Sequence, residues 1–266
     1  MASIHPTAIV HPKAELAEDV EIGPYCVIGP NVAIDSGTTL GAHVVIEENT
    51  IIGKANHIGH GAILGAPPQD RKFKHECTYL RIGDGNLIRE YVTLHRASGE
   101  EQETRIGNYC FLMAYVHIGH NCEVGDGVVM ANSVGISGHC VIEEGANIGG
   151  MTGVHQFTRI GRLAMVGGMS RIVRDVPPYL LVEGNPAVVH GVNLVGLRRA
   201  GIPEANRTAL RLACRLLYFA DLNLSQAMER IRAEVPLVPE VEHLLRFLEE
   251  TRQGRNGRYL DRPSRK

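Results

Sequence analysis

The 266-residue chain contains no tryptophan, and its aromatic content is only 5%. Large aromatic side chains dominate most globular cores, so their scarcity favours a regular architecture that fills its interior in another way. No apolar run approaches the roughly 20 residues that a membrane span needs, and the N-terminus lacks the basic and apolar segments of a signal peptide. The six cysteines lack the paired spacing of a zinc site. We therefore expect a cytoplasmic protein with no membrane span and no bound metal.

The net charge is also small, at −2, which gives no indication of a nucleic-acid partner. The charge is unevenly divided, however. Residues 1–192 hold 13 Lys and Arg against 20 Asp and Glu, whereas residues 193–266 hold 14 against 9. An arginine-rich end suits an acidic protein or a phosphate, although a solvated helix surface has the same composition.

The chain is rich in glycine, with 30 residues, and its apolar residues recur with a period of six residues. Stepping by six from Ile4 to Ile172, 26 of 29 positions are apolar, and only Asp70, Glu76 and Glu100 interrupt the series. The position four residues later is small or β-branched, as in Cys26 and Val32. This period fits neither a helix nor an alternating strand. It predicts a short strand and a turn repeated around a narrow prism, with cysteines packed inside it.

The interruptions predict two loops, within residues 65–81 and 97–105, and loops on a rigid scaffold often carry function. The period ends after Val176-Pro177-Pro178. Helical patterns follow over about 202–220, 224–234 and 239–252, separated by prolines. We therefore expect two domains, a repeat domain over residues 1–190 and a helical domain over residues 191–266.

Histidines recur at one place in the repeat. Ile118, Ile136 and Val154 are 18 residues apart, so the residues that follow them should stack about 4.8 Å apart. These are His120, Gly138-His139 and His155-Gln156, with His117 just before them. A neutral imidazole can accept a hydroxyl proton and so act as a general base. Three histidines can instead bind zinc. In the third interpretation, these are surface histidines on a polar face with no function. All three interpretations remain open, since His-Ile-Gly-His also occurs at residues 57–60.

The period resembles that of the hexapeptide-repeat proteins, in which three hexapeptides form one coil of a left-handed parallel β-helix. Longer segments sharpen the likeness: Met113–His120, Ser137-Gly138-His139, Gly149–Phe157, Asp175–Tyr179 and Gly191–Arg199. Together they are similar to the UDP-N-acetylglucosamine 3-O-acyltransferase family, which catalyses the first step of lipid A synthesis. The resemblance implies an all-β left-handed β-helix with a helical end, a homotrimer, acyl carrier protein as acyl donor, UDP-N-acetylglucosamine as acceptor, and no cofactor.

The resemblance also implies roles for individual residues. His120 matches the general base, and Gly138 matches the backbone N–H that stabilises the oxyanion. Contacts with the nucleotide sugar are implied for Gln69, Asp70, Lys72, His95, His117, His139, His155, Gln156, Asn193 and Arg199. Met113 and Gly168 match positions that measure the length of the acyl chain.

Two positions depart from the family pattern. Asn121 stands where many members have an aspartate after the base, and Ala200 where many have a second arginine. Four alternatives are an acyltransferase acting on a 3-amino sugar, a CoA-dependent acetyltransferase, a zinc carbonic anhydrase of hexapeptide type and a non-catalytic scaffold. The first usually has an extra N-terminal domain, whereas here the repeats begin at Ile4.

Overall fold

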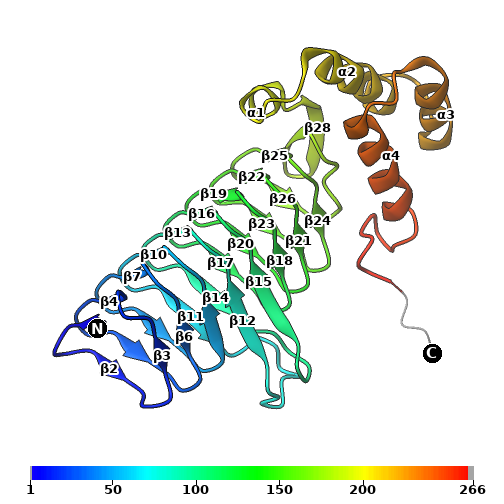
Figure 1. The fold of residues 1–266 in the computed structure, drawn as a ribbon. Coiled ribbons are helices and arrows are strands. Elements are labelled where there is room, and N and C mark those ends of the chain that lie inside the picture. Colours follow the sequence, from blue (N-terminus) through cyan, green and yellow to red (C-terminus); the bar gives the residue numbers. More distant parts are fainter. Residues whose placement is uncertain (1, 263–266) are drawn as a thin grey trace.

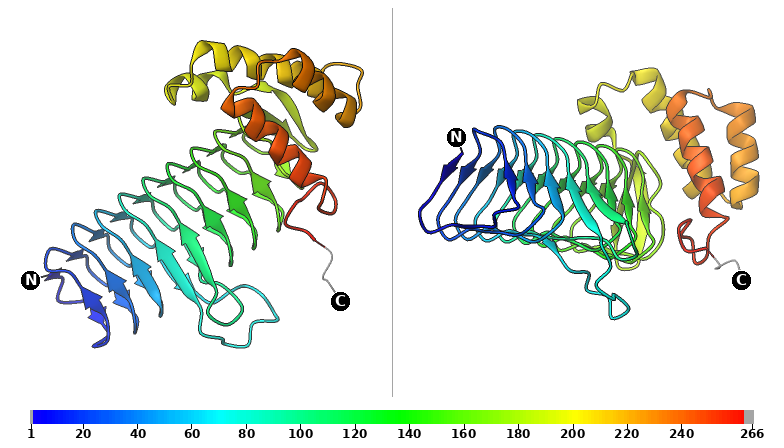
Figure 2. Two further views of the ribbon diagram at one scale, coloured as in Figure 1. Left: turned by 45° about the vertical axis from the view of Figure 1, so that its right-hand side comes forward. Right: turned by 60° about the horizontal axis from the view of Figure 1, so that its bottom comes forward.

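The computed structural model describes residues 2–262 and shows a long prism with a helical end (Figures 1 and 2). The prism is a left-handed parallel β-helix with three faces. Each coil contributes one short strand to each face, because each six-residue repeat supplies one strand and one turn. The N-terminus lies at one end of the prism and the helices cover the other.

The three faces are three sheets. Sheet A consists of β1 Ser3–Ile4, β4 Glu21–Ile22, β7 Thr39–Leu40, β10 His57–Ile58, β13 Leu87–Ile88, β16 Phe111–Leu112, β19 Val129–Met130, β22 Asn147–Ile148, β25 Met165–Val166, β27 Leu180–Gly184 and β28 Ala187–Val192. Sheet B consists of β2 Ile9–Val10, β5 Val27–Ile28, β8 Val45–Ile46, β11 Ile63–Ala66, β14 Thr93–His95, β17 His117–Ile118, β20 Gly135–Ile136, β23 Gly153–Val154 and β26 Arg171–Ile172. Sheet C consists of β3 Glu15–Leu16, β6 Ala33–Ile34, β9 Thr50–Ile52, β12 Tyr79–Ile82, β15 Glu103–Ile106, β18 Glu123–Val124, β21 Val141–Ile142 and β24 Arg159–Ile160.

The strand register explains why the six-residue phase survives both loops. Ordinary coils pair residues 18 apart, as in Ile22 with Leu40. Leu64 instead pairs with Leu94, 30 residues on, and Leu94 pairs with Ile118, 24 residues on. The two loops therefore insert 12 and 6 residues, which are whole multiples of the repeat. The three polar positions in the apolar series, Asp70, Glu76 and Glu100, lie in these insertions.

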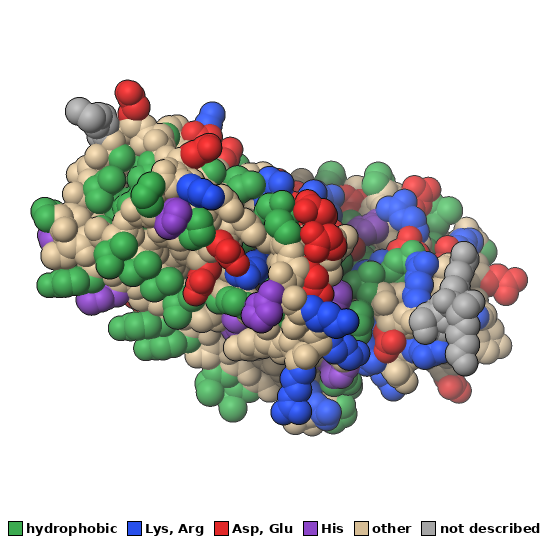
Figure 3. Space-filling view, turned by 90° about the horizontal axis from the view of Figure 1, so that it is seen from below, with side chains coloured by type: hydrophobic (Ala, Val, Ile, Leu, Met, Phe, Trp, Pro, Cys, Tyr) green, Lys and Arg blue, Asp and Glu red, His purple; other side chains and the backbone are tan. Residues whose placement is uncertain are grey.

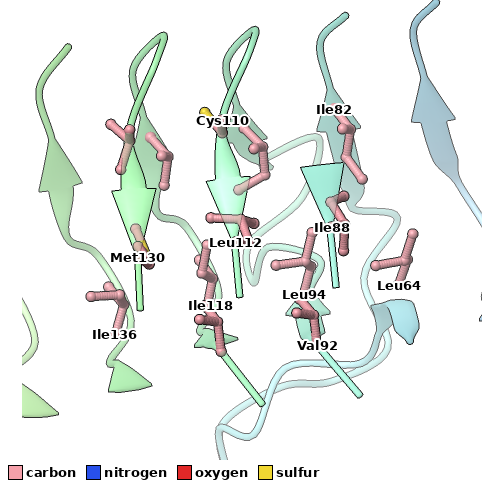
Figure 4. Packing of buried hydrophobic residues seen from close by; sticks show 14 of the residues in the cluster. Leu64, Ile82, Ile88, Val92, Leu94, Cys110, Leu112, Ile118, Met130 and Ile136 are labelled. Carbon is pink, nitrogen blue, oxygen red and sulfur yellow. The ribbon is translucent and has the colours of Figure 1, made fainter. Parts of the chain in front are cut away.

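The aliphatic residues of the repeat fill the interior of the prism. Figure 4 shows Ile88, Leu94, Leu112 and Ile118 pointing into the interior from two successive coils, and each is fully buried. Each such side chain contributes about 1.5–3 kcal/mol when buried, and each coil buries its core only against its neighbours. The predicted packing role of the cysteines is confirmed at Cys26, Cys110, Cys122 and Cys140, which are all buried in this core.

The helical end consists of α1 Leu194–Arg199, α2 Glu204–Tyr218, α3 Leu224–Glu234 and α4 Pro239–Thr251. The last three agree with the helical patterns in the sequence, whereas α1 and the antiparallel hairpin of β27 and β28 were not foreseen. These helices have their own core around Leu210, Leu244 and Ile231. No helix in residues 2–262 is long and apolar enough to cross a membrane.

A buried arginine fixes α4 against the prism. Arg159, on the last strand of sheet C, pairs with Asp175 at 3.4 Å and with Glu250 at 2.6 Å. Its guanidinium also lies 4.0 Å from the centre of the Phe247 ring and 4.4 Å from that of Tyr259. The ion pairs and the aromatic contacts of Arg159 together hold the helical end in a defined position against the prism.

Candidate active site

Both loops and most of the candidate site residues lie along one edge of the prism. We call the turns that lead from sheet B to sheet C the B–C corner. The two loops, residues 67–78 and 96–102, leave this corner from successive coils, and Figures 1 and 2 show them projecting from the prism. The next three turns at the same corner follow β17, β20 and β23 and carry His120, Gly138-His139 and His155-Gln156. The stacking predicted from the 18-residue spacing is therefore present in the structure.

His120 is half-buried, and its two ring nitrogens have different neighbours. Nδ1 lies 2.8 Å from Oδ1 of Asn121. The face of the ring packs on Gly138 of the next coil, where a Cβ placed at residue 138 would lie 2.7 Å from Nε2, 2.8 Å from Cε1 and 3.1 Å from Cδ2. Nε2 is thus the nitrogen available to a substrate, and Gly138 has no side chain because the ring occupies that space.

Gly138 also offers a hydrogen-bond donor. Within residues 2–262 its backbone N–H has no acceptor, whereas the N–H of His139 donates to the carbonyl of His120 at 2.9 Å. Backbone N–H groups that are covered by the protein nearly always find an acceptor. A ligand oxygen beside His120 Nε2 would be a suitable acceptor.

The surrounding histidines form two edge-to-face pairs. The rings of His120 and His139 are 5.0 Å apart, and those of His95 and His117 are 5.1 Å apart. Burial lowers the pKa of His117 to about 4, and it also lowers the pKa values of His95 and His139 below the usual 6.5. These imidazoles are therefore neutral near pH 7 and can act as hydrogen-bonding groups beside the site.

A shallow depression of 310 Å³ adjoins this corner on the outer face of sheet B. Its floor includes Gly135 and Gly153, and His117 and His155 line it together with Arg171. Nothing lies within 4 Å of a Cβ built on either glycine, so the depression is open to a ligand. Nδ1 of His155 donates to the carbonyl of Gln156 at 2.9 Å, which leaves Nε2 of His155 free to accept.

The first loop carries Gln69, Asp70 and Lys72. Asp70 Oδ1 accepts a hydrogen bond from the backbone N–H of Lys72 at 3.0 Å. The charge of Asp70 opposes the effect of burial on the pKa of His139, so the carboxylate lies near that ring. His95 anchors the start of the loop, because its Nδ1 donates to the carbonyl of Pro67 at 2.6 Å.

Other candidate residues lie at different corners. Asn193 caps α1 and donates from Nδ2 to the carbonyl of Leu163, in a turn between sheets C and A, and Arg199 ends the same helix. Met113 and Gly168 lie in turns between sheets A and B, after β16 and β25. One chain therefore brings together the histidines, Gly138 and the first loop, but it does not bring Asn193, Arg199, Met113 or Gly168 to the same corner.

Two contacts of the site were missed by the sequence analysis. Phe157 stacks on His139 at 4.8 Å between ring centres, and the 18-residue spacing between these positions could have revealed it. Ser98 contacts Asn121, and no spacing rule predicts that contact because Ser98 lies in an insertion. Among residues 2–262 no three His, Cys, Asp or Glu side chains of one chain are arranged to hold a metal ion.

Comparisons with known proteins place the chain in a family. The family description "Udp N-acetylglucosamine O-acyltransferase; Domain 2" matches residues 175–256, and the bacterial transferase hexapeptide description matches residues 1–36 and 103–138. The acyl-[acyl-carrier-protein]–UDP-N-acetylglucosamine O-acyltransferase of Thermodesulfovibrio yellowstonii is 47% identical over 96% of this chain and 99% of its own length. That of Halorhodospira halophila is 45% identical over 96% and 99%.

Solved structures agree. LpxA, a UDP-N-acetylglucosamine acyltransferase from Bacteroides fragilis, has a TM-score of 0.90 and 38% identity, with 92% of this chain and 96% of that chain covered. The UDP-N-acetylglucosamine O-acyltransferase of Moraxella catarrhalis has a TM-score of 0.86 and 45% identity, with 91% and 95% covered. With its hexapeptide prism, its histidine-lined corner and these relatives along nearly its whole length, the chain belongs to the acyl-[acyl-carrier-protein]–UDP-N-acetylglucosamine O-acyltransferase family.

Proposed function

We propose that this protein transfers a 3-hydroxyacyl group, or a similar acyl group, from acyl carrier protein to the 3-hydroxyl of UDP-N-acetylglucosamine, with His120 as the general base. The single observation that carries the assignment of the base is the placement of His120 Nε2 directly against Gly138. Base and oxyanion donor then lie on neighbouring coils, where they can flank one thioester carbonyl. Family membership supports the overall reaction.

The reaction proceeds by direct attack. Nε2 of His120 takes the proton from the sugar 3-hydroxyl as its oxygen bonds to the thioester carbon. The carbonyl oxygen becomes an oxyanion, which accepts a hydrogen bond from the N–H of Gly138. When the C–S bond breaks, the imidazolium returns the proton to the thiolate of the carrier protein. No cysteine is needed as a nucleophile, and burial raises the pKa of Cys110 to about 11 and that of Cys122 well above its ordinary value.

The residues around the base would hold the acceptor. Neutral His117 and His139 suit hydroxyl and carbonyl groups of a sugar and a base, because each neutral imidazole offers one donor and one acceptor. His155 adds a third ring at the same corner. Asp70 and Lys72 on the first loop add a carboxylate and a cation, and Gln69, His95 and Gln156 add further polar contacts. Asn193 and Arg199 would contact the uridine and the diphosphate, for which a guanidinium fork is suited. Gly168 and Met113 would limit the length of the acyl chain.

We also propose that the working unit is a homotrimer. On sheet B, Ile9 is 67% exposed and Val27 is 41% exposed, and Figure 3 shows hydrophobic side chains on the surface of the N-terminal coils. Sheet C instead carries Arg81, Arg105 and Glu123 on its face. A ring of three chains would cover such apolar faces with heterologous contacts, and a neighbouring chain would bring Asn193 and Gly168 toward the histidine corner.

The donor would dock through charge. Acyl carrier protein is acidic, and residues 193–266 hold 14 Lys and Arg against 9 Asp and Glu. Opposite charges at the rim of an interface raise the rate of encounter and weaken with salt. We also propose that the reaction takes place in the cytoplasm.

The test is to incubate the protein with UDP-N-acetylglucosamine and a series of acyl carrier protein thioesters and to weigh the products. The proposal requires one added acyl group and an ester, which mild alkali cleaves. An amide product, formed only from a 3-amino sugar, would instead support the N-acyltransferase alternative. No product from either sugar would contradict the proposed function.

A further inference from the structure

The second loop contacts the catalytic corner through one residue. Oδ1 of Asn121 accepts hydrogen bonds from the backbone N–H of Ser98 at 2.9 Å and from its Oγ at 3.3 Å. Nδ2 of Asn121 donates to the backbone carbonyl of Ser98 at 3.0 Å. The same Oδ1 lies 2.8 Å from Nδ1 of His120. Asn121 thus bridges the main chain of the loop and the proposed base.

This pairing settles which end of the amide faces His120. The main chain of Ser98 presents one donor and one acceptor side by side, and only one orientation of the Asn121 amide matches both. Its oxygen must face the N–H of Ser98, so the same oxygen faces His120. Nδ1 of His120 must then carry the proton in the neutral ring, because an amide oxygen only accepts. Nε2, which lies beside Gly138, is left unprotonated and able to act as a base.

The loop is held in place independently of Asn121. Arg96 at its start is 3% exposed, donates to the carbonyl of Gly65 at 3.0 Å and pairs with Glu48 at 2.8 Å. Ala97 is fully buried, and its N–H donates to the carbonyl of Tyr79. At the far end, the N–H of Glu101 donates to the carbonyl of Cys77 at 2.9 Å. The main chain of Ser98 is therefore held in place by contacts that do not involve Asn121.

The backbone of Asn121 is fixed as well. Its φ is +57°, a left-handed value that Asn tolerates better than most residues. Its N–H donates to Oγ1 of Thr104 at 2.8 Å, on the strand that follows the loop. Both the main chain and the side chain of residue 121 are thus tied to the inserted segment and its exit.

We propose that loop 96–102 positions the catalytic base, with Asn121 as a positioning residue that the main chain of Ser98 holds so that His120 stays in its Nδ1–H tautomer. The inference rests on the proposed function of His120, although the tautomer itself does not. The bridge to Ser98 also explains why residue 121 is an asparagine in this chain. A carboxylate at residue 121 would place an anionic oxygen about where Nδ2 lies, 3.0 Å from the carbonyl oxygen of Ser98, and the two acceptors would repel each other.

Three variants separate positioning from charge. Asn121→Gly removes the bridge while accepting the positive φ. Asn121→Asp keeps the shape and adds a charge but loses the donor to Ser98. Ser98→Ala is the matched control, because it removes only the 3.3 Å hydroxyl contact and retains both main-chain partners. The titratable rings nearest His120, His95 and His139, are the same in all three proteins.

The first readout is the tautomer of His120, measured by NMR after selective ¹⁵N-histidine labelling, with His120→Ala used only to assign the signal. We expect the Nδ1–H form in the wild type and in Ser98→Ala, and a mixed or Nε2–H form in Asn121→Gly. An Nε2–H ring in the wild type, or an unchanged tautomer in Asn121→Gly, would overturn the proposal. This readout is independent of turnover, so it stands even if His120 proves not to be the base.

The second readout is the pH profile of kcat. A misplaced base loses about 10–10²-fold, so we expect Asn121→Gly and Asn121→Asp to lower the plateau of kcat by that factor with little change in KM. Ser98→Ala should stay within about twofold of the wild type. If charge rather than position mattered, Asn121→Asp would reach a plateau equal to or above that of the wild type at high pH, and the proposal would be wrong.

Discussion

Replacing Gly138 with alanine tests the geometry of the corner. A Cβ at residue 138 would lie 2.7 Å from Nε2 and 2.8 Å from Cε1 of His120. The ring must withdraw by about 0.7 Å to reach an ordinary contact of about 3.4 Å, and this movement displaces the base relative to the N–H of Gly138. Because a misplacement of about 1 Å can cost 10²-fold in rate, we expect kcat to fall by about 10–10²-fold.

Stability should change little in this variant. Gly138 has no positive φ, so alanine fits its backbone, and losing a glycine stabilises by about 0.4–1 kcal/mol through the unfolded chain. An off-rotamer His120 costs about 0.5–1.5 kcal/mol, which offsets that gain. The assay is initial-rate kinetics with the best acyl donor, accompanied by thermal unfolding.

The duplicate motif supplies a matched control. A Cβ at Gly41 would lie 2.8 Å from Nδ1 of His60, a similar clash remote from the proposed site. Gly41→Ala should therefore keep wild-type turnover, although its Tm should fall further because the Cβ also lies 3.0 Å from the backbone nitrogen of His60, which cannot rotate away. If Gly138→Ala also kept wild-type turnover, the argument that Gly138 and His120 flank the reacting carbonyl would be refuted.

Three further predictions concern acyl length, pH and assembly. Gly168→Met should shift the preferred donor to a shorter chain without abolishing turnover, and unchanged selectivity across a donor series would assign the limit to another residue. The free energy of unfolding should fall as pH drops from about 6.5 to about 4, because the unfolded chain holds a proton on His117 that the buried ring rejects; His117→Gln should flatten the fall in Tm, and an unchanged slope would contradict this. Light scattering should give the mass of three chains, and Val27→Glu on sheet B should reduce it whereas Val141→Glu on sheet C should not; a monomeric wild type would rule out the trimer.

The architecture could be predicted from the sequence because one rule governs it. A six-residue period places one aliphatic side chain inward per strand, so burial and turn positions follow by counting. Even the insertions obey the count, since 30-residue and 24-residue offsets preserve the phase at Leu94 and Ile118. The alignment of His120 with Gly138 follows from the same 18-residue count, because their strands pair one coil apart.

Features outside the repeat could not be predicted in the same way. The hairpin of β27 and β28 continues sheet A after the period ends, and its antiparallel pairing has no signal in a six-residue count. The contact of Ser98 with Asn121 depends on the path of a loop, which is set by Arg96 and Glu48 from another coil. The hydrogen bond that Nδ2 of Asn193 donates to the carbonyl of Leu163 likewise depends on how the helices meet the prism. In each case the deciding contact joins residues whose spacing carries no periodic information.

The most direct test of the account is the turnover of His120→Ala beside that of His60→Ala. Both histidines end the string His-Ile-Gly-His, but Nδ1 of His60 accepts from the N–H of Ala42 at 2.8 Å, and no long loop leaves its turn. Loss of a general base costs about 10²–10⁴-fold, so His120→Ala should lose that much kcat with its Tm nearly unchanged, whereas His60→Ala should stay near the wild type. Near-normal turnover in His120→Ala would contradict the mechanism.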